Sequence, residues 1–204
     1  MFRFTKLGIV IASIALVLVA ACESSPAQEP TVPSQVGESQ VGESPEFPPN
    51  RLIKLVAPLD DPDHYCLDIR GWGSNIRLQE SLQAHTCKPS DNRDQQYTYL
   101  SLTNQIYSEE YDLCVQPESL EEDSQIFLRE CSDAPLQKFT PQADGLIRHL
   151  ADGADSLCIA IAPGEGHVIN AIHKRRELFV NSCDTTDSSL ITWEFASGAA
   201  GTGS

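Results

Sequence analysis

The chain has 204 residues, of which 41% are hydrophobic, and its formal net charge at pH 7 is −15. This length and apolar content suffice for one ordinary domain with a packed core, plus accessory segments. The 29 Asp and Glu residues outnumber the 14 Lys and Arg residues. A surface of this sign repels phosphate backbones, so the composition disfavours nucleic-acid binding.

The N-terminus is typical of an export signal. Arg3 and Lys6 precede an apolar run that ends in Val19-Ala20-Ala21-Cys22. This ending resembles the bacterial lipobox, which implies that residues 1–21 are a lipoprotein signal peptide and that Cys22 becomes the lipidated first residue. An uncleaved membrane anchor is the less favoured alternative, because a spanning helix needs about 20 apolar residues. We therefore expect a lipid-anchored protein of the cell envelope, in the outer membrane or at the cell surface.

Attachment would depend on the lipid alone. Removal of residues 1–21 leaves 12 Lys and Arg against 29 Asp and Glu, a net charge of −17. Such a chain gains nothing from anionic headgroups, whereas two or more acyl chains hold a protein firmly.

Residues 22–50 are expected to form a disordered tether. They contain the tandem Gln35–Ser39 and Gln40–Ser44, five Glu and no Lys or Arg. Such a composition buries little apolar surface, and its charges repel one another and extend the chain. A binding motif within the tandem is the less favoured alternative. At the other end, residues 197–204 (SGAAGTGS) are expected to form a flexible tail.

Residues 51–196 contain a unit that occurs three times. Each unit has a cysteine between apolar residues, a second cysteine after an alternating apolar run, and a closing aromatic residue. The first cysteines are Cys66, Cys114 and Cys158, the second are Cys87, Cys131 and Cys183, and the aromatic residues are Tyr97, Phe139 and Trp193. Short alternating runs between Gly, Asp, Asn and Pro predict an all-β sandwich or barrel.

The six cysteines that follow Cys22 indicate disulfides in an oxidising compartment. Six cysteines allow 15 pairings. The equivalence of the three units predicts one of them: Cys66 with Cys87, Cys114 with Cys131, and Cys158 with Cys183. Each bridge contributes about 3 kcal/mol in the chain-entropy model. No Cys-x-x-Cys pair and no metal-ligand spacing of the five His residues occur, so neither a zinc site nor another cofactor is expected.

These repeats resemble the ricin B-type lectin family. The resemblance covers about 145 residues and rests on the cysteines and on the endings Gln95-Gln96-Tyr97, Gln137-Lys138-Phe139 and Ile191-Thr192-Trp193. It implies a β-trefoil of three four-stranded repeats, with the three closing aromatic side chains in the shared core.

The resemblance also implies a sugar pocket in the first repeat. In such a pocket a carboxylate accepts hydrogen bonds from two hydroxyls, amides bind the next hydroxyl, and a flat ring covers the apolar face of the sugar. The matching residues are Asp68, Gln83 and Gln95. Asp94 stands where Asn is usual, His85 stands in place of the usual aromatic ring, and Trp72 is an alternative platform. Taken singly, each polar side chain could instead satisfy a turn or the backbone. Asp94 would repel Asp68 unless a cation or a hydroxyl donor lies between them.

The other two repeats depart from the pocket pattern. The corresponding residues are Gln116, Phe127, Arg129 and Leu136 in the second repeat, and Ala160, Phe179, Asn181 and Ile191 in the third. We expect both to be inactive. A single shallow site binds weakly, so useful avidity would require many anchored copies or a clustered glycan.

No catalytic motif occurs in the sequence, and we expect no enzyme. The pairs Asp60-Asp61, Glu109-Glu110 and Glu121-Glu122 are expected to be solvated surface, and Lys174–Arg176 an exposed turn. The leading hypothesis is a lipid-anchored lectin with a glycan ligand. The alternative is a non-catalytic interaction subunit with an unidentified protein partner, because the architecture is also similar to the A subunit of cytolethal distending toxins.

Overall fold

The computed structural model describes residues 47–150 and 156–198. The predicted signal peptide, Cys22 and nearly all of the predicted tether and tail lie outside these residues. None of the helices in this described part has the length and apolar character of a membrane span.

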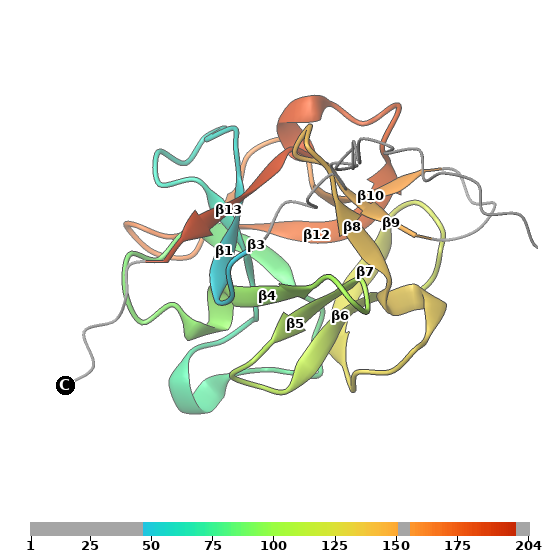
Figure 1. The fold of residues 1–204 in the computed structure, drawn as a ribbon. Coiled ribbons are helices and arrows are strands. Elements are labelled where there is room, and N and C mark those ends of the chain that lie inside the picture. Colours follow the sequence, from blue (N-terminus) through green and yellow to red (C-terminus); the bar gives the residue numbers. More distant parts are fainter. Residues whose placement is uncertain (1–46, 151–155, 199–204) are drawn as a thin grey trace, which may run out of the picture. The chain divides into compact units, whose positions relative to one another are not determined.

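The described chain is built from short β-strands in three successive repeats, as predicted (Figure 1). The first repeat contains β1 (Arg51–Leu55), β2 (Tyr65–Asp68), β3 (Gln83–Thr86) and β4 (Gln96–Leu100). The second contains β5 (Gln105–Ser108), β6 (Leu113–Pro117), β7 (Ser124–Arg129) and β8 (Phe139–Pro141). The third contains β9 (Ile147–His149), β10 (Leu157–Ile161), β12 (Lys174–Ser182) and β13 (Trp193–Ser197), with the two-residue β11 (His167–Val168) as an addition.

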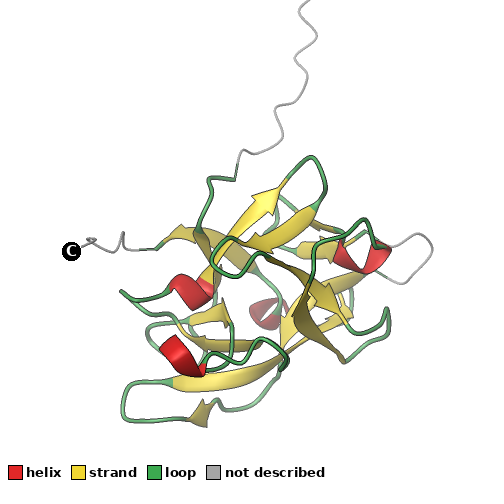
Figure 2. Cartoon of the chain, turned by 90° about the horizontal axis from the view of Figure 1, so that it is seen from below, coloured by secondary structure: helices red, strands yellow, loops and turns green. Residues whose placement is uncertain are grey.

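Four short 3-10 helices lie between these strands (Figure 2). They are η1 (Gly73–Asn75), η2 (Arg93–Gln95), η3 (Pro135–Gln137) and η4 (Ser188–Leu190). The last three each occupy the turn that leads into the closing aromatic segment of a repeat. The fold is the all-β trefoil expected from the sequence.

The three repeats share one strand register. In the central hairpin of each repeat, the first cysteine lies opposite His85, Arg129 or Asn181. The residue two positions after that cysteine lies opposite Gln83, Phe127 or Phe179 in the same order. These pairs match the equivalences read from the sequence. β1 also pairs with β13, so the first and last strands lie side by side (Figure 1).

The predicted disulfides and core are confirmed. The bridges are Cys66–Cys87, Cys114–Cys131 and Cys158–Cys183, one in each repeat. The closing aromatic residues Tyr97 and Phe139 are fully buried, and Trp193 is 3% exposed. The indole Nε1 of Trp193 donates a hydrogen bond to the carbonyl of Ile159 (2.9 Å), so its polar atom is satisfied within the core.

Strand β12 corrects one sequence prediction. Lys174–Arg176 begins this nine-residue strand and is not an exposed turn. Its first residues pair with β3 of the first repeat, where Arg175 lies opposite His85, and its later residues pair with β10. A strand that continues into another repeat satisfies backbone groups that a turn would leave to solvent.

Asp60 and Asp61 are also not the solvated surface that was predicted. Asp61 is 4% exposed and accepts a hydrogen bond from the hydroxyl of Thr86 (2.6 Å). Asp60 accepts hydrogen bonds from Arg176, Lys174, Tyr65 and the backbone N–H of Gly166. Burial alone would raise the pKa of the Asp60 carboxyl, but these donors hold it well below its usual range. Asp60 thereby joins the first repeat to the β11–β12 hairpin of the third.

Candidate functional site

Asp68 lies at the end of β2 with only 1% of its surface exposed. Antiparallel pairing places Gln83 opposite it, and Gln83 Nε2 donates a hydrogen bond to Asp68 Oδ1 (2.6 Å). Gln95 Nε2 donates to Asp68 Oδ2 (2.9 Å), and Lys88 Nζ lies 3.2 Å from the same oxygen. Both carboxylate oxygens are therefore bonded within the protein.

Lys88 lies between Asp68 and Asp94, where the sequence analysis expected a cation or a hydroxyl donor but named no residue. Its Nζ contacts Asp94 Oδ2 as well as Asp68, and Asp94 is 5% exposed. Lys88 directly follows Cys87, a position that the family pattern does not specify, and Ser132 and Asp184 follow the corresponding cysteines of the other repeats. Burial raises the pKa of Asp68 to about 7, while the charge of Lys88 opposes this shift and that of Asp94 adds to it.

Gln95 is fully buried and its amide is fully used. Its Oε1 accepts a hydrogen bond from the backbone N–H of Lys88 (2.9 Å), and its Nε2 also donates to the carbonyl of Thr86 (3.1 Å). This side chain therefore fastens η2 to the end of β3. The position does not fit the ligand-contacting role predicted for it.

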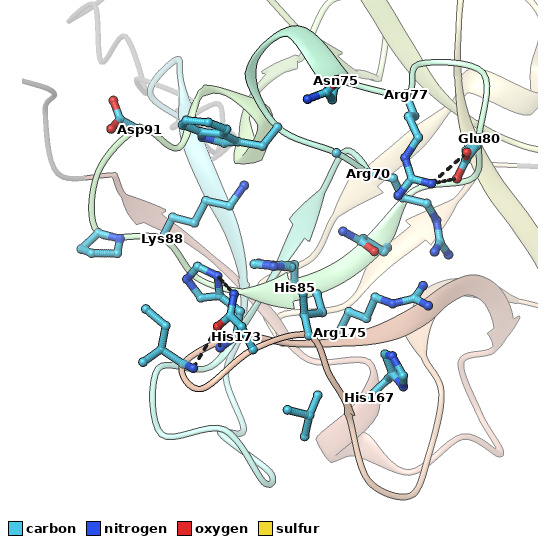
Figure 3. A pocket seen from close by; sticks show the side chains of 18 of the residues that line it. Arg70, Asn75, Arg77, Glu80, His85, Lys88, Asp91, His167, His173 and Arg175 are labelled. Atoms are coloured by element: carbon cyan, nitrogen blue, oxygen red, sulfur yellow. Dashed lines mark hydrogen bonds and ion pairs between the residues drawn. The ribbon is translucent and has the colours of Figure 1, made fainter.

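A cavity of about 1070 Å³ opens beside this cluster (Figure 3). Three of the six predicted site residues line it, namely Trp72, Gln83 and His85. The other three, Asp68, Asp94 and Gln95, lie behind the lining and hold it in place. The cluster therefore supports the site from within, and the cavity is the surface that a ligand can reach.

Trp72 forms an exposed platform at the rim of the cavity. It is 65% exposed, and its carbonyl accepts a hydrogen bond from the N–H of Asn75 (2.9 Å), the last residue of η1. The turn depends on Gly71, whose φ is +98° and where an added Cβ would lie 2.2 Å from the carbonyl oxygen of Asn75. The turn thus presents a large ring to solvent, outside the core.

His85 and His173 place two imidazole rings together in the cavity lining. Their centroids are 5.0 Å apart and their planes are inclined by 60°. The Nδ1 of His85 lies 2.9 Å from the carbonyl of Thr86. Burial lowers the pKa of both histidines, and the neighbouring His85 lowers that of His173 further. Both rings are therefore mainly neutral at pH 7.

The third repeat supplies a wall of this cavity, which the sequence analysis missed. His167, His173 and Arg175 come from the β11–β12 hairpin, and Figure 3 places Arg175 beside His85. The repeat register relates equivalent positions but carries no information about contacts between repeats. Within residues 47–150 and 156–198, no group of three or more His, Cys, Asp and Glu side chains is arranged to hold a metal ion.

Comparisons with known proteins identify the same fold. Among solved structures, the agglutinin from Abrus precatorius aligns with a TM-score of 0.54 and 17% identity, over 78% of this chain and 51% of that one. The Vibrio vulnificus hemolysin/cytolysin β-trefoil lectin, solved with N-acetyl-D-lactosamine bound, aligns with a TM-score of 0.50 and 13% identity, over 72% of this chain and 93% of that one. No curated protein matches the sequence significantly. The model of the ricin-type β-trefoil lectin domain matches residues 58–190, more than half of the chain, and the chain therefore belongs to this family.

Proposed function

We propose that the protein is a lipid-anchored, exported carbohydrate-binding protein with one sugar pocket, in its first repeat. The observation that carries this proposal is the cavity at that repeat, with Trp72, Gln83 and His85 in its lining. It lies where the family pattern of the sequence placed a pocket. The family membership and the lactosamine-bound relative support a glycan as the ligand.

The lining offers the groups that a sugar requires. Trp72 provides a ring face for the apolar side of a pyranose. The hydrogen bond from Gln83 Nε2 to Asp68 leaves the amide oxygen of Gln83 as an acceptor for a sugar hydroxyl. Asp68 therefore acts as a positioning residue, because it fixes the orientation of that amide without touching the ligand.

The other repeats are proposed to be inactive. In the second repeat Phe127 replaces the amide, and the guanidinium of Arg129 lies 4.4 Å above its ring. In the third repeat Phe179 and Asn181 stand at these positions. Two smaller cavities, of about 390 and 330 Å³, include none of these four side chains.

A glycan array probed with the purified, oxidised chain tests the proposal. Trp72→Ala is the informative variant, because removal of a 65% exposed ring leaves the core intact. Leu102→Ala is the matched control, since Leu102 is an apolar side chain that is 98% exposed and does not line the cavity. Binding that Trp72→Ala weakens and Leu102→Ala leaves unchanged supports the pocket. Equal binding by all three proteins would remove the first repeat from the proposal.

The lipid anchor is tested separately. Mass spectrometry of the protein isolated from membranes is expected to find a diacylated or triacylated Cys22 as the first residue. Cys22→Ser is expected to abolish the lipid and leave the signal peptide in place. An unmodified Cys22 in membrane-extracted protein would contradict the anchor.

A second candidate is a non-catalytic interaction subunit of toxin type. Its support is the group of exposed apolar side chains on the rim of the cavity: Val168, Ile169 and Ile172 are 61%, 46% and 71% exposed. Apolar groups gathered on one face favour a protein partner. Failure to bind any glycan, together with a stable complex formed through this rim, would favour this candidate over the lectin.

A further inference from the structure

The charges that line the cavity are opposite in sign to those of the rest of the chain. Four of the 14 Lys and Arg residues line it, against two of the 29 Asp and Glu residues. The cations are Arg70, Arg77, Lys88 and Arg175, and the carboxylates are Glu80 and Asp91. Figure 3 places Arg70 and Arg77 on one side of the cavity and Lys88 on the other, with His85 and Arg175 between them. The cavity lining is therefore positively charged in an otherwise acidic protein.

Two of these cations are committed to the fold. Arg70 is 10% exposed at its side chain, donates to the carbonyl of Ser81 (2.8 Å) and pairs with Glu177. Lys88 is 12% exposed and pairs with Asp68 and Asp94. Breaking either set of contacts would leave a buried charge without its partner, which is strongly destabilising. Neither cation is the natural contact for a ligand.

Arg77 and Arg175 are available to a ligand. The side chain of Arg77 is 55% exposed and pairs only with Glu80, three residues along (3.0 Å), among the described residues. Arg175 is 31% exposed, and its one polar partner in the same part of the chain is Glu177 at 3.5 Å, a carboxylate that Arg70 already holds. Ion pairs this exposed contribute little to stability, so a ligand carboxylate can replace the protein carboxylate.

We infer that the pocket takes a saccharide that carries a carboxylate, such as a sialic or uronic acid residue, through Arg77 or Arg175. This inference rests on the proposed sugar-binding function and names its ligand class. Guanidinium binds carboxylate with two parallel hydrogen bonds, which adds orientation to attraction. The net charge of −15 repels long polyanions. A single carboxylate on a short saccharide therefore fits the cavity better than a polysulfated chain.

The experiment compares pairs of short glycans that differ only in the carboxylate. The probes are N-acetyllactosamine with its sialylated form and an oligosaccharide ending in glucose with its glucuronate counterpart, plus a sulfated lactosamine. We expect at least one carboxylated probe to bind about tenfold more tightly than its neutral partner. The preference should diminish as NaCl is raised from 0.05 to roughly 0.5 M, because salt screens exposed charges.

Single substitutions test whether the preference for carboxylated glycans arises in the cavity. Arg77→Gln and Arg175→Gln are each made, and at least one is expected to remove most of the preference while neutral glycans still bind. Arg93→Gln is the control with the same change in net charge, since Arg93 is 74% exposed and lies outside this cavity. Glu80→Gln should strengthen carboxylate binding about two- to fivefold, because it releases Arg77 from its partner. Circular dichroism and thermal unfolding check that each variant is folded.

Each outcome bears on a distinct claim. Equal binding of neutral and carboxylated probes overturns the inference and leaves the sugar pocket standing. A stronger preference for the sulfated probe overturns the carboxylate assignment. A loss of preference in Arg93→Gln equal to that in both cavity variants overturns the placement in the cavity. Failure of every glycan to bind overturns the proposed function itself.

Discussion

The first and second repeats build the same hydrogen-bond frame around different central side chains. In the first repeat, Gln95 accepts from the N–H of Lys88 and donates to the carbonyl of Thr86 and to Asp68. In the second repeat, Gln137 accepts from the N–H of Ser132 (2.8 Å) and donates to the carbonyl of Glu130 (2.8 Å) and to Gln116 (3.0 Å). The frame is thus a property of the fold.

What differs between the two repeats is the group that the frame holds. The first repeat holds the carboxylate of Asp68, with Lys88 and Asp94 around it, whereas the second holds the neutral amide of Gln116. The carboxylate fixes Gln83 at a cavity wall, and the second repeat has Phe127 instead. Within this one motif, Gln95 therefore has a structural role, whereas Gln83, which lies opposite Asp68, lines the cavity.

The largest expected effect is a loss of stability that distinguishes Asp68 from Gln116. Asp68→Ala leaves Lys88 with one buried partner in place of two and removes the acceptor of both Gln83 and Gln95, so we expect a loss of about 3–5 kcal/mol in unfolding free energy. Gln116→Ala removes one hydrogen bond between neutral groups and should cost about 1 kcal/mol. Urea unfolding of the oxidised proteins measures both. Equal losses would mean that the buried charge has no special role in the first repeat.

The next effect tests what the repeats share. Gln95→Ala removes three hydrogen bonds. Gln137→Ala removes the equivalent three and a fourth, which Gln105 Nε2 donates to Gln137 Oε1 (2.8 Å). We expect each substitution to cost about 1–3 kcal/mol. The two losses should be of similar size, because both side chains are buried and three of their bonds occupy equivalent places. A large cost for Gln95 with almost none for Gln137 would show that the frame is specific to the first repeat.

A smaller effect concerns binding and not stability. Trp72→Ala should weaken glycan binding about tenfold, the worth of one stacked ring. The thermal unfolding midpoint of Trp72→Ala should match that of the parent protein, since the Trp72 ring is 65% exposed. Titration calorimetry and a thermal melt provide the two numbers. A marked fall in the midpoint would place Trp72 in the structural frame.

A separate effect, measured as a change of stability with pH, is the pH dependence that the carboxylate brings to the first repeat. Asp68 has an ordinary pKa of 3.8, raised by burial to about 7, so the folded protein binds a proton more tightly than the unfolded chain. Its contribution to stability is present below pH 4 and is lost as the pH rises toward 7. In Asp68→Asn this contribution disappears. The stability of the parent protein relative to the variant should therefore fall between pH 4 and 7, as urea titrations at several pH values can measure, and a rise would contradict the raised pKa.

The features that recur in all three repeats could be predicted from the sequence, but few of the contacts between repeats could. The cysteine pairs and the core aromatic residues were predicted because three copies in one register confirm one another. Lys88 was missed, since the motif does not include that position. Arg175 and His173 were missed because antiparallel pairing of β12 with β3 brings together segments far apart in the chain. Contacts between repeats depend on how the repeats pack, and no local pattern encodes them.

The most direct test of the central claim uses two matched positions in the repeat register. His85 and Arg129 lie opposite the first cysteine of the first and second repeats, respectively. A glycan identified on the array is titrated into the parent protein, His85→Ala and Arg129→Ala. We expect at least about tenfold weaker binding for His85→Ala and an unchanged Kd for Arg129→Ala. Loss of binding in Arg129→Ala, with His85→Ala unaffected, would contradict a sugar pocket in the first repeat.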